Sequence, residues 1–127
     1  MQLLLDTHTI IWYAEDDPRL PGHIRQMIKD DSSDVFVSVI SPWEMSIKSR
    51  QGKLDLNRSF DGMVRLMQNN GFCFLPIQLN HVYCLDTLEP HHKDPFDRML
   101  IAQALTEDFA IVGCDDVFDL YGVRRLW

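Results

Sequence analysis

Short runs of apolar residues recur along this chain and alternate with segments in which apolar residues return every three or four positions. The short runs predict buried strands, and the spaced segments predict helices. The predicted strands are Leu3–Leu5, Val35–Ile40, Phe72–Ile77, Phe109–Val112 and Val123–Leu126. The predicted helices are Gly22–Lys29, Pro42–Arg50, Phe60–Gln68, Val82–Leu88 and a segment that begins at Pro95. This alternation favours an α/β fold with a mainly parallel sheet of about five strands.

Two of the predicted helices begin with the same kind of sequence. In the first, Ser41 suits the capping position, Pro42 suits the first helical position, and Glu44 completes an S-x-x-E capping box. In Asp94-Pro95-Phe96-Asp97 the first aspartate is the predicted cap, the proline opens the helix, and the second aspartate lies in its first turn.

Composition and charge narrow the class of protein. The 127 residues suffice for one domain and not for two, so we expect residues 1–127 to form a single domain. The net charge of −7 argues against a broad basic face for nucleic acid, but not against an enzyme that meets phosphate through a metal ion. No signal peptide, membrane span or C-x-x-C pair is present, so we expect a reducing, cytoplasmic setting.

Four acidic residues follow or begin the elements that meet at one edge of the predicted sheet. Strand ends and the starts of the following helices share that edge, which is where ligands bind in such folds. Asp6 ends the first strand, Glu44 and Asp97 lie near two helix starts, and Asp115 follows the fourth strand. Asp94 and Asp116 are possible additional members, and the neighbours Asp115 and Asp116 compete for the fourth place.

Such a cluster favours a hard divalent cation, because close carboxylates cannot all stay ionised at their usual pKa. Mg²⁺ takes oxygen ligands and Mn²⁺ binds the same oxygens, so the sequence allows either. A metal-activated water would then attack a phosphodiester. No nucleophile triad and no glycine-rich phosphate loop competes with this interpretation.

Each acid also has a purely structural interpretation. Glu44 and Asp97 suit the first turns of helices, and Asp115 suits a turn. Asp6 is the strongest candidate, because an acid that ends an apolar strand has no evident capping role. The shared edge of the sheet, more than any single residue, favours a common site.

Other polar and aromatic residues near this edge have weaker signals. Thr7 either orients a ligand or bonds to local backbone, and His8, His91 and His92 are expected in loops or packing, since Mg²⁺ prefers oxygen. We expect the tryptophans to pack in the core or an interface rather than to stack on bases. The candidate contacts to phosphate are Lys48, Lys53, Lys93 and Arg98. The three tryptophans are Trp12, Trp43 and Trp127.

Four ordered blocks of the sequence resemble PIN-domain toxins of the VapC-like class. The blocks are Leu4-Leu5-Asp6-Thr7-His8, then Ser38 to Lys48 followed by Gly52-Lys53-Leu54, then His92 to Ala104, and last Asp115 to Trp127. The resemblance covers the whole chain in order. It implies a three-layer α/β/α fold and Mg²⁺- or Mn²⁺-dependent endonucleolytic cleavage of RNA by Asp6, Glu44, Asp97 and Asp115. It also implies a small antitoxin that covers the site, and a homodimer.

Three other functions deserve comparison. A phosphatase with an aspartyl nucleophile would carry a second acid two places after Asp6, where His8 stands. A response-regulator receiver would need an acidic pair near the start. A catalytically silent PIN-like scaffold that binds a protein or RNA partner is the alternative, and retention of all four acids argues against it.

Overall fold

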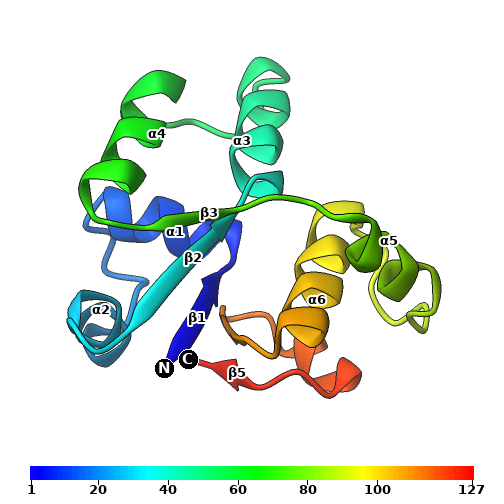
Figure 1. The fold of residues 1–127 in the computed structure, drawn as a ribbon. Coiled ribbons are helices and arrows are strands. Elements are labelled where there is room, and N and C mark those ends of the chain that lie inside the picture. Colours follow the sequence, from blue (N-terminus) through cyan, green and yellow to red (C-terminus); the bar gives the residue numbers. More distant parts are fainter.

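The computed structural model describes residues 1–127, and its centre is a parallel five-stranded sheet (Figure 1). The strand order is β3-β2-β1-β4-β5, and every neighbouring pair is parallel. All five predicted strands are confirmed, most with shorter bounds: β1 Gln2–Leu5, β2 Asp34–Ser38, β3 Cys73–Leu75, β4 Ala110–Val112 and β5 Arg125–Leu126. With β1 in the middle, the carboxyl ends of β1, β2 and β4 adjoin.

The connections between strands are helical, as parallel pairing requires. The helices are α1 Thr7–Ala14, α2 Gly22–Lys29, α3 Ile40–Arg50, α4 Phe60–Asn69, α5 Leu79–Asp86, α6 Pro95–Glu107 and the 3-10 helix η1 Asp116–Tyr121. Helix α1 and η1 are absent from the sequence prediction. Helix α1 buries Thr7, Thr9, Ile10, Ile11 and Tyr13, so it shows no polar face and no amphipathic period.

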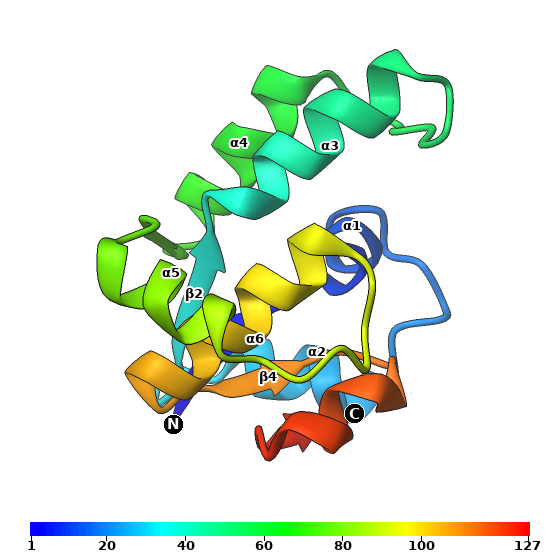
Figure 2. The ribbon, with the colours of Figure 1, turned by 90° about the vertical axis from the view of Figure 1, so that its right-hand side faces the viewer.

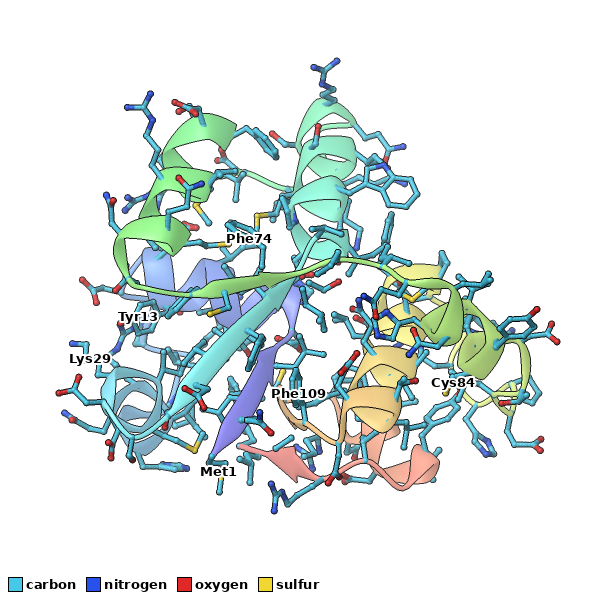
Figure 3. All side chains as sticks on the ribbon, in the orientation of Figure 1. Met1, Tyr13, Lys29, Phe74, Cys84 and Phe109 are labelled. Carbon is cyan, nitrogen blue, oxygen red and sulfur yellow. The ribbon has the colours of Figure 1, made fainter.

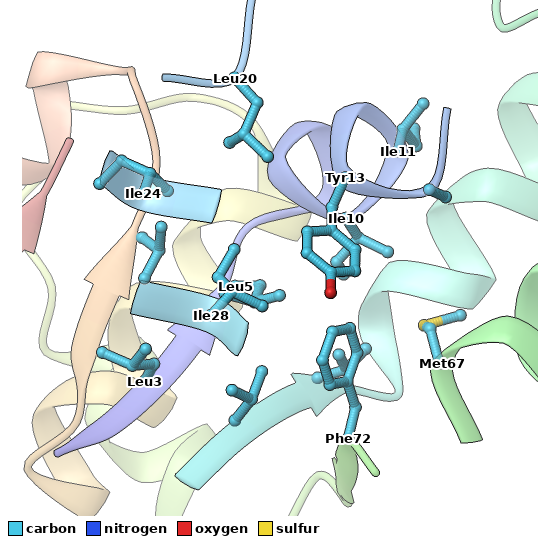
Figure 4. Close-up of a cluster of buried hydrophobic side chains, with 14 of the residues drawn as sticks. Leu3, Leu5, Ile10, Ile11, Tyr13, Leu20, Ile24, Ile28, Met67 and Phe72 are labelled. Carbon is cyan, nitrogen blue, oxygen red and sulfur yellow. The ribbon is translucent and has the colours of Figure 1, made fainter. Parts of the chain in front are cut away.

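Two hydrophobic clusters cover the two faces of the sheet. On one face Leu3 and Leu5 pack with residues of α1, α2 and α4, as Figure 4 shows for part of the cluster. On the other face Leu4 packs with α6 and η1, including the fully buried Phe118. Successive residues of β1 point to opposite faces, so one strand serves both clusters. The predicted three-layer α/β/α arrangement is confirmed.

Helix α3 does not begin as the sequence predicts. It starts at Ile40, two residues early, because β2 runs into it almost without a loop. Val39 takes the capping position without a side-chain bond, and Ser38 Oγ accepts from the amide of Ile40 at 3.1 Å. The predicted Ser41 cap and its capping box with Glu44 are therefore wrong. Pro42 is tolerated in this first turn, where amides lack helical partners.

Helix α6 begins as predicted. Asp94 is its cap, and its Oδ1 accepts from the amides of Phe96 at 2.8 Å and Asp97 at 3.2 Å. Pro95 is the first helical residue. This start fixes Asp97 at the edge of the sheet where β1, β2 and β4 end.

Candidate active site

The four predicted acids meet at the carboxyl edge of the sheet. The starts of α1 and α6 and the first half of α3 lie around this edge in Figure 2. The charges of Glu44 and Asp115 act on Asp6, and those of Asp6 and Glu44 act on Asp97. The acids come from four separate segments of the chain, so the fold has gathered them in one cluster.

Burial raises the pKa of two carboxyl groups in this cluster, those of Asp6 and Asp97. The pKa of Asp6 is raised to about 6, chiefly by burial and further by Glu44 and Asp115, while hydrogen bonding by Thr9 lowers it. The pKa of Asp97 is also raised to about 6, by burial first and then by the charges of Asp94, Asp6 and Glu44. The negative forms therefore lack compensation within the protein, and a cation at this point would supply it.

Asp6 has a structural task that the sequence did not reveal. Its Oδ1 caps α1 by accepting from the amide of Thr9 at 2.8 Å, so the expectation that it has no capping role is wrong. Its Oδ2 faces Gly113 so closely that a Cβ there would lie 2.5 Å away. Only glycine at position 113 leaves room for this carboxylate.

Glu44 is buried, and two side chains, Thr7 and Lys48, contact its carboxylate. The hydroxyl of Thr7 donates to its Oε1 at 2.6 Å and also lies 3.0 Å from Ser41 Oγ. Lys48, one turn further along α3, forms an ion pair with Oε2 and lies 3.9 Å from Asp94 Oδ2. Thr7 thus orients a carboxylate of the cluster, which decides between the two roles predicted for it.

His92 lies in a loop, as the sequence predicted, and its side chain also contacts the cluster. Its Nε2 lies 2.9 Å from Asp97 Oδ2 and 3.5 Å from Asp115 Oδ2. These three side chains form a group whose ligand atoms all lie within 4.8 Å of one another. Asp115 also caps η1 through its other oxygen, Oδ1, which accepts from the amide of Val117.

The geometry separates the neighbours Asp115 and Asp116. Asp115 Oδ2 faces His92, and its charge acts on Asp6. Asp116 is exposed, and its charge acts on Arg125. Asp115 is therefore the better placed for a role in the cluster.

Two side chains hold the loop that carries His92. Arg98 donates to the carbonyls of Leu88, Glu89 and His92 and to the hydroxyl of Tyr121. That hydroxyl donates to the carbonyl of Glu89 and accepts from the amide of His92 at 2.7 Å. The guanidinium is thus bonded to three backbone carbonyls and to the Tyr121 hydroxyl, so it holds the loop, and no contact seen here favours the expected role in binding phosphate.

The tryptophans differ in burial. Trp12 and Trp127 pack against the core and each other, with ring centroids 5.8 Å apart, as expected. Trp43 is 56% exposed and contacts Phe96 edge-on at 5.5 Å. It lies directly before Glu44 and outside the core. His8, Lys53 and Lys93 are exposed.

The donor set of the cluster suits Mg²⁺ or Mn²⁺. Asp6, Glu44, Asp97 and Asp115 offer carboxylate oxygens from four segments, and the buried Asp6 has no basic side chain paired with it, whereas Glu44 is paired with Lys48. Oxygen ligands of this kind are what hard divalent ions prefer. His92 adds one nitrogen, which Mn²⁺ accepts more readily than Mg²⁺.

None of the helices has the length and hydrophobicity that crossing a bilayer requires.

Comparison with known families identifies this arrangement. A model of the PIN domain matches residues 3–123, nearly the whole chain. The chain belongs to the PIN-domain family. No curated protein is similar enough in sequence to count as a relative of this PIN domain.

Solved structures share its fold at low identity. VapBC2 from Rickettsia felis, bound to a DNA fragment from their promoter, has 11% identity and a TM-score of 0.75 over 99% of this chain and 98% of that one. VapBC-1 from nontypeable Haemophilus influenzae has 15% sequence identity and a TM-score of 0.69, over 99% of this chain and 97% of that one. FitAcB from Neisseria gonorrhoeae has 16% sequence identity and a TM-score of 0.67, over 98% of this chain and 96% of that one. These likenesses concern the fold of the PIN domain.

Proposed function

We propose that this PIN domain is an endoribonuclease that depends on Mg²⁺ or Mn²⁺ and acts as the toxin of a toxin–antitoxin pair. One observation carries the proposal: four carboxylates from four segments meet at the ligand-binding edge of a PIN fold, and Asp6 and Asp97 have pKa values raised to about 6. A structural role does not require four acids to gather where they repel one another.

The proposed roles follow from position. Asp6, Glu44, Asp97 and Asp115 hold the ion, while Thr7 orients Glu44. Asp94 caps α6, and its charge adds to the negative potential at Asp97. When bound, the ion supplies a positive centre that draws the scissile phosphate and promotes ionisation of the attacking water.

Hydrolysis also needs a group that can hold a proton near the reacting phosphate. The pKa of Asp97 is about 6 in the metal-free protein, and an ion bound to this carboxylate would lower it, so Asp97 serves as a ligand rather than as the proton acceptor. Its Oδ2 shares a hydrogen bond with Nε2 of His92. The imidazole of His92 is therefore the candidate proton acceptor beside the ion.

The proposed partners are an RNA substrate, a small antitoxin and a second copy of the chain, in a cytoplasmic setting. The sequence resemblance to VapC-like toxins supports the antitoxin, and the VapBC names of structures with the same fold agree with it. A basic side chain of the antitoxin would compensate the acidic cluster. A short, antitoxin-like reading frame beside this gene would support the pairing.

The test is cleavage of a labelled RNA by purified protein with Mg²⁺ or Mn²⁺, with EDTA, and with an Asp97→Asn variant. We expect cuts only with metal and only by the wild-type protein. Equal cleavage in EDTA would overturn the metal role. RNA left intact under every metal condition would overturn the nuclease proposal and favour a silent scaffold.

A further inference from the structure

A cavity of about 240 Å³ lies directly beside the acidic cluster. Glu44, a member of the cluster, and Thr7, which donates to it, both line the cavity, so the cavity adjoins the cluster. The rest of its wall comes from α1 and from the end of α3 with the loop behind it. These residues are His8, Ile11, Lys48, Lys53 and Leu54.

The wall of this cavity carries two basic residues, although the chain as a whole is acidic. Lys48 and Lys53 stand here in a protein whose net charge is −7. Lys48 is paired with Glu44, whereas Lys53 is exposed and forms no ion pair, so its charge is available to a ligand. Beyond Asp115, the first turn of η1 carries the acids Asp116 and Asp119, of which Asp119 is paired with Arg125. A polyanion that reaches the cluster is therefore attracted from the lysine side.

The backbone at the end of α3 fixes the positions of Lys48 and Lys53 relative to each other. Gly52 has a φ of +71°, a conformation that glycine adopts without strain, and it turns the chain back on the helix. The amide of Lys53 donates to the carbonyl of Lys48 at 2.9 Å, and that of Gly52 donates to Ser49 at 3.2 Å. These two bonds are the Schellman helix stop. Leu54, the next residue, packs against the core and anchors the segment.

We propose that this cavity is a subsite for a backbone phosphate of the RNA strand, next to the phosphate that is cut, with Lys53 as its main contact. The proposal rests on the proposed nuclease function. A nucleic acid strand presents phosphates in series, so a strand held at the cluster must place a neighbouring phosphate on one of the adjoining surfaces. Lysine binds phosphate as a point charge, and each neutralised phosphate releases counterions.

The test measures binding of a fluorescently labelled single-stranded RNA by anisotropy, in EDTA so that no cleavage occurs. The variant is Lys53→Gln, and the matched control is Lys29→Gln. Lys29 ends α2 beside the start of β2, at the opposite edge of the sheet (Figure 3). We expect Lys53→Gln to weaken binding several-fold and to reduce the slope of log affinity against log salt by about 0.7, the value for one contact to a single strand. Lys29→Gln should change neither quantity.

Cleavage assays with metal complete the test. Lys53→Gln should raise KM for RNA relative to Lys29→Gln, because the subsite contributes to binding. Equal salt slopes and equal KM values for the two variants, in a protein that cleaves RNA, would overturn the subsite and leave the nuclease function intact. A Lys53 variant that weakened only the complex with a protein partner would also overturn it. If the wild-type protein cuts no RNA, the nuclease function fails and the subsite fails with it, whereas cleavage with unchanged salt slopes and KM values overturns the subsite alone.

Discussion

The starts of α3 and α6 are alike in sequence and different in structure. Each offers a capping residue, a proline and an acid three places after the cap. At α6 these residues take the positions that helix chemistry assigns to them, with Asp94 as the cap. At α3 the helix begins at Ile40, the predicted cap Ser41 lies inside it, and no side chain caps it.

This difference between the two helix starts changes the surroundings of Glu44 and Asp97. Glu44 is buried in the body of α3, where it has no capping task and instead contacts Thr7 and Lys48. Asp97 lies in a well-capped first turn, yet burial and neighbouring acids raise its pKa. The needs of helix formation therefore explain neither the burial of Glu44 nor the raised pKa of Asp97. Both follow from the place of these residues in the cluster at the edge of the sheet.

The largest effect should come from neutralising either acid. Asp97→Asn and Glu44→Gln keep the side-chain shapes and remove a negative charge from the cluster. We expect RNA cleavage at saturating Mn²⁺ to fall by more than about 100-fold, since losing even an outer partner of a metal site costs roughly 10–100-fold. Circular dichroism should show an intact fold. A variant with near wild-type cleavage would remove its acid from the site.

The contact between Thr7 and Glu44 should matter less than the acid itself. Thr7→Val keeps the shape and removes the hydroxyl that donates to Glu44 Oε1. We expect Mn²⁺ affinity, measured by calorimetry, to fall roughly 10–100-fold. Thr7→Ser retains the hydroxyl and should bind Mn²⁺ nearly as the wild type does. Equal loss in both variants would point to packing of the threonine methyl group instead.

The two helix starts should respond differently to loss of the predicted cap. Asp94→Ala removes two hydrogen bonds to the amides of α6 and should cost about 1 kcal/mol, or roughly 3–5 °C in Tm. Asp94→Ser restores a capping oxygen and should recover most of this loss. Ser41→Ala removes no cap, only the bond that Ser41 Oγ accepts from the Thr7 hydroxyl, and should cost less than Asp94→Ala in the same thermal melt. The reverse order would contradict the observed start of α3.

The raised pKa values predict how stability depends on pH when metal is absent. Asp6 and Asp97 have a pKa of about 6 in the folded protein against an ordinary value of 3.8 for an aspartate in an unfolded chain, so the folded state binds more protons between these values. Stability should therefore fall as pH rises through this window. We expect a Tm a few degrees higher at pH 5 than at pH 7.5 in EDTA. Mg²⁺ added at pH 7.5 should raise Tm, and Asp6→Asn should flatten the pH dependence.

The sequence predicted the sheet and four acids because both follow from local rules. Short apolar runs identify strands, and the carboxyl ends of parallel strands share an edge. The same rules missed helix α1, which is buried on most sides and therefore shows no amphipathic period. They predicted a further helix at Val82–Leu88, and the structure places it three residues earlier at its start, as α5 Leu79–Asp86. The start of α5 at Leu79 depends on His81, whose Nδ1 accepts from the amide of Gln78.

The place of His92 was beyond sequence reasoning. It lies in an irregular loop, and its position depends on bonds from Arg98 and from Tyr121, 29 residues away along the chain. No periodicity or helix signal records such a contact. The capping roles of Asp6 and Asp115 were hidden for a similar reason, because α1 and η1 were not predicted.

The bonds from Arg98 and Tyr121 also have a thermodynamic consequence. The segment between α5 and α6 has no regular structure around His92, yet the carbonyls of Leu88, Glu89 and His92 are each held by a side chain. Ordering a loop costs conformational entropy. Here that entropy is lost once, when the chain folds, and the imidazole then meets every substrate molecule already in position.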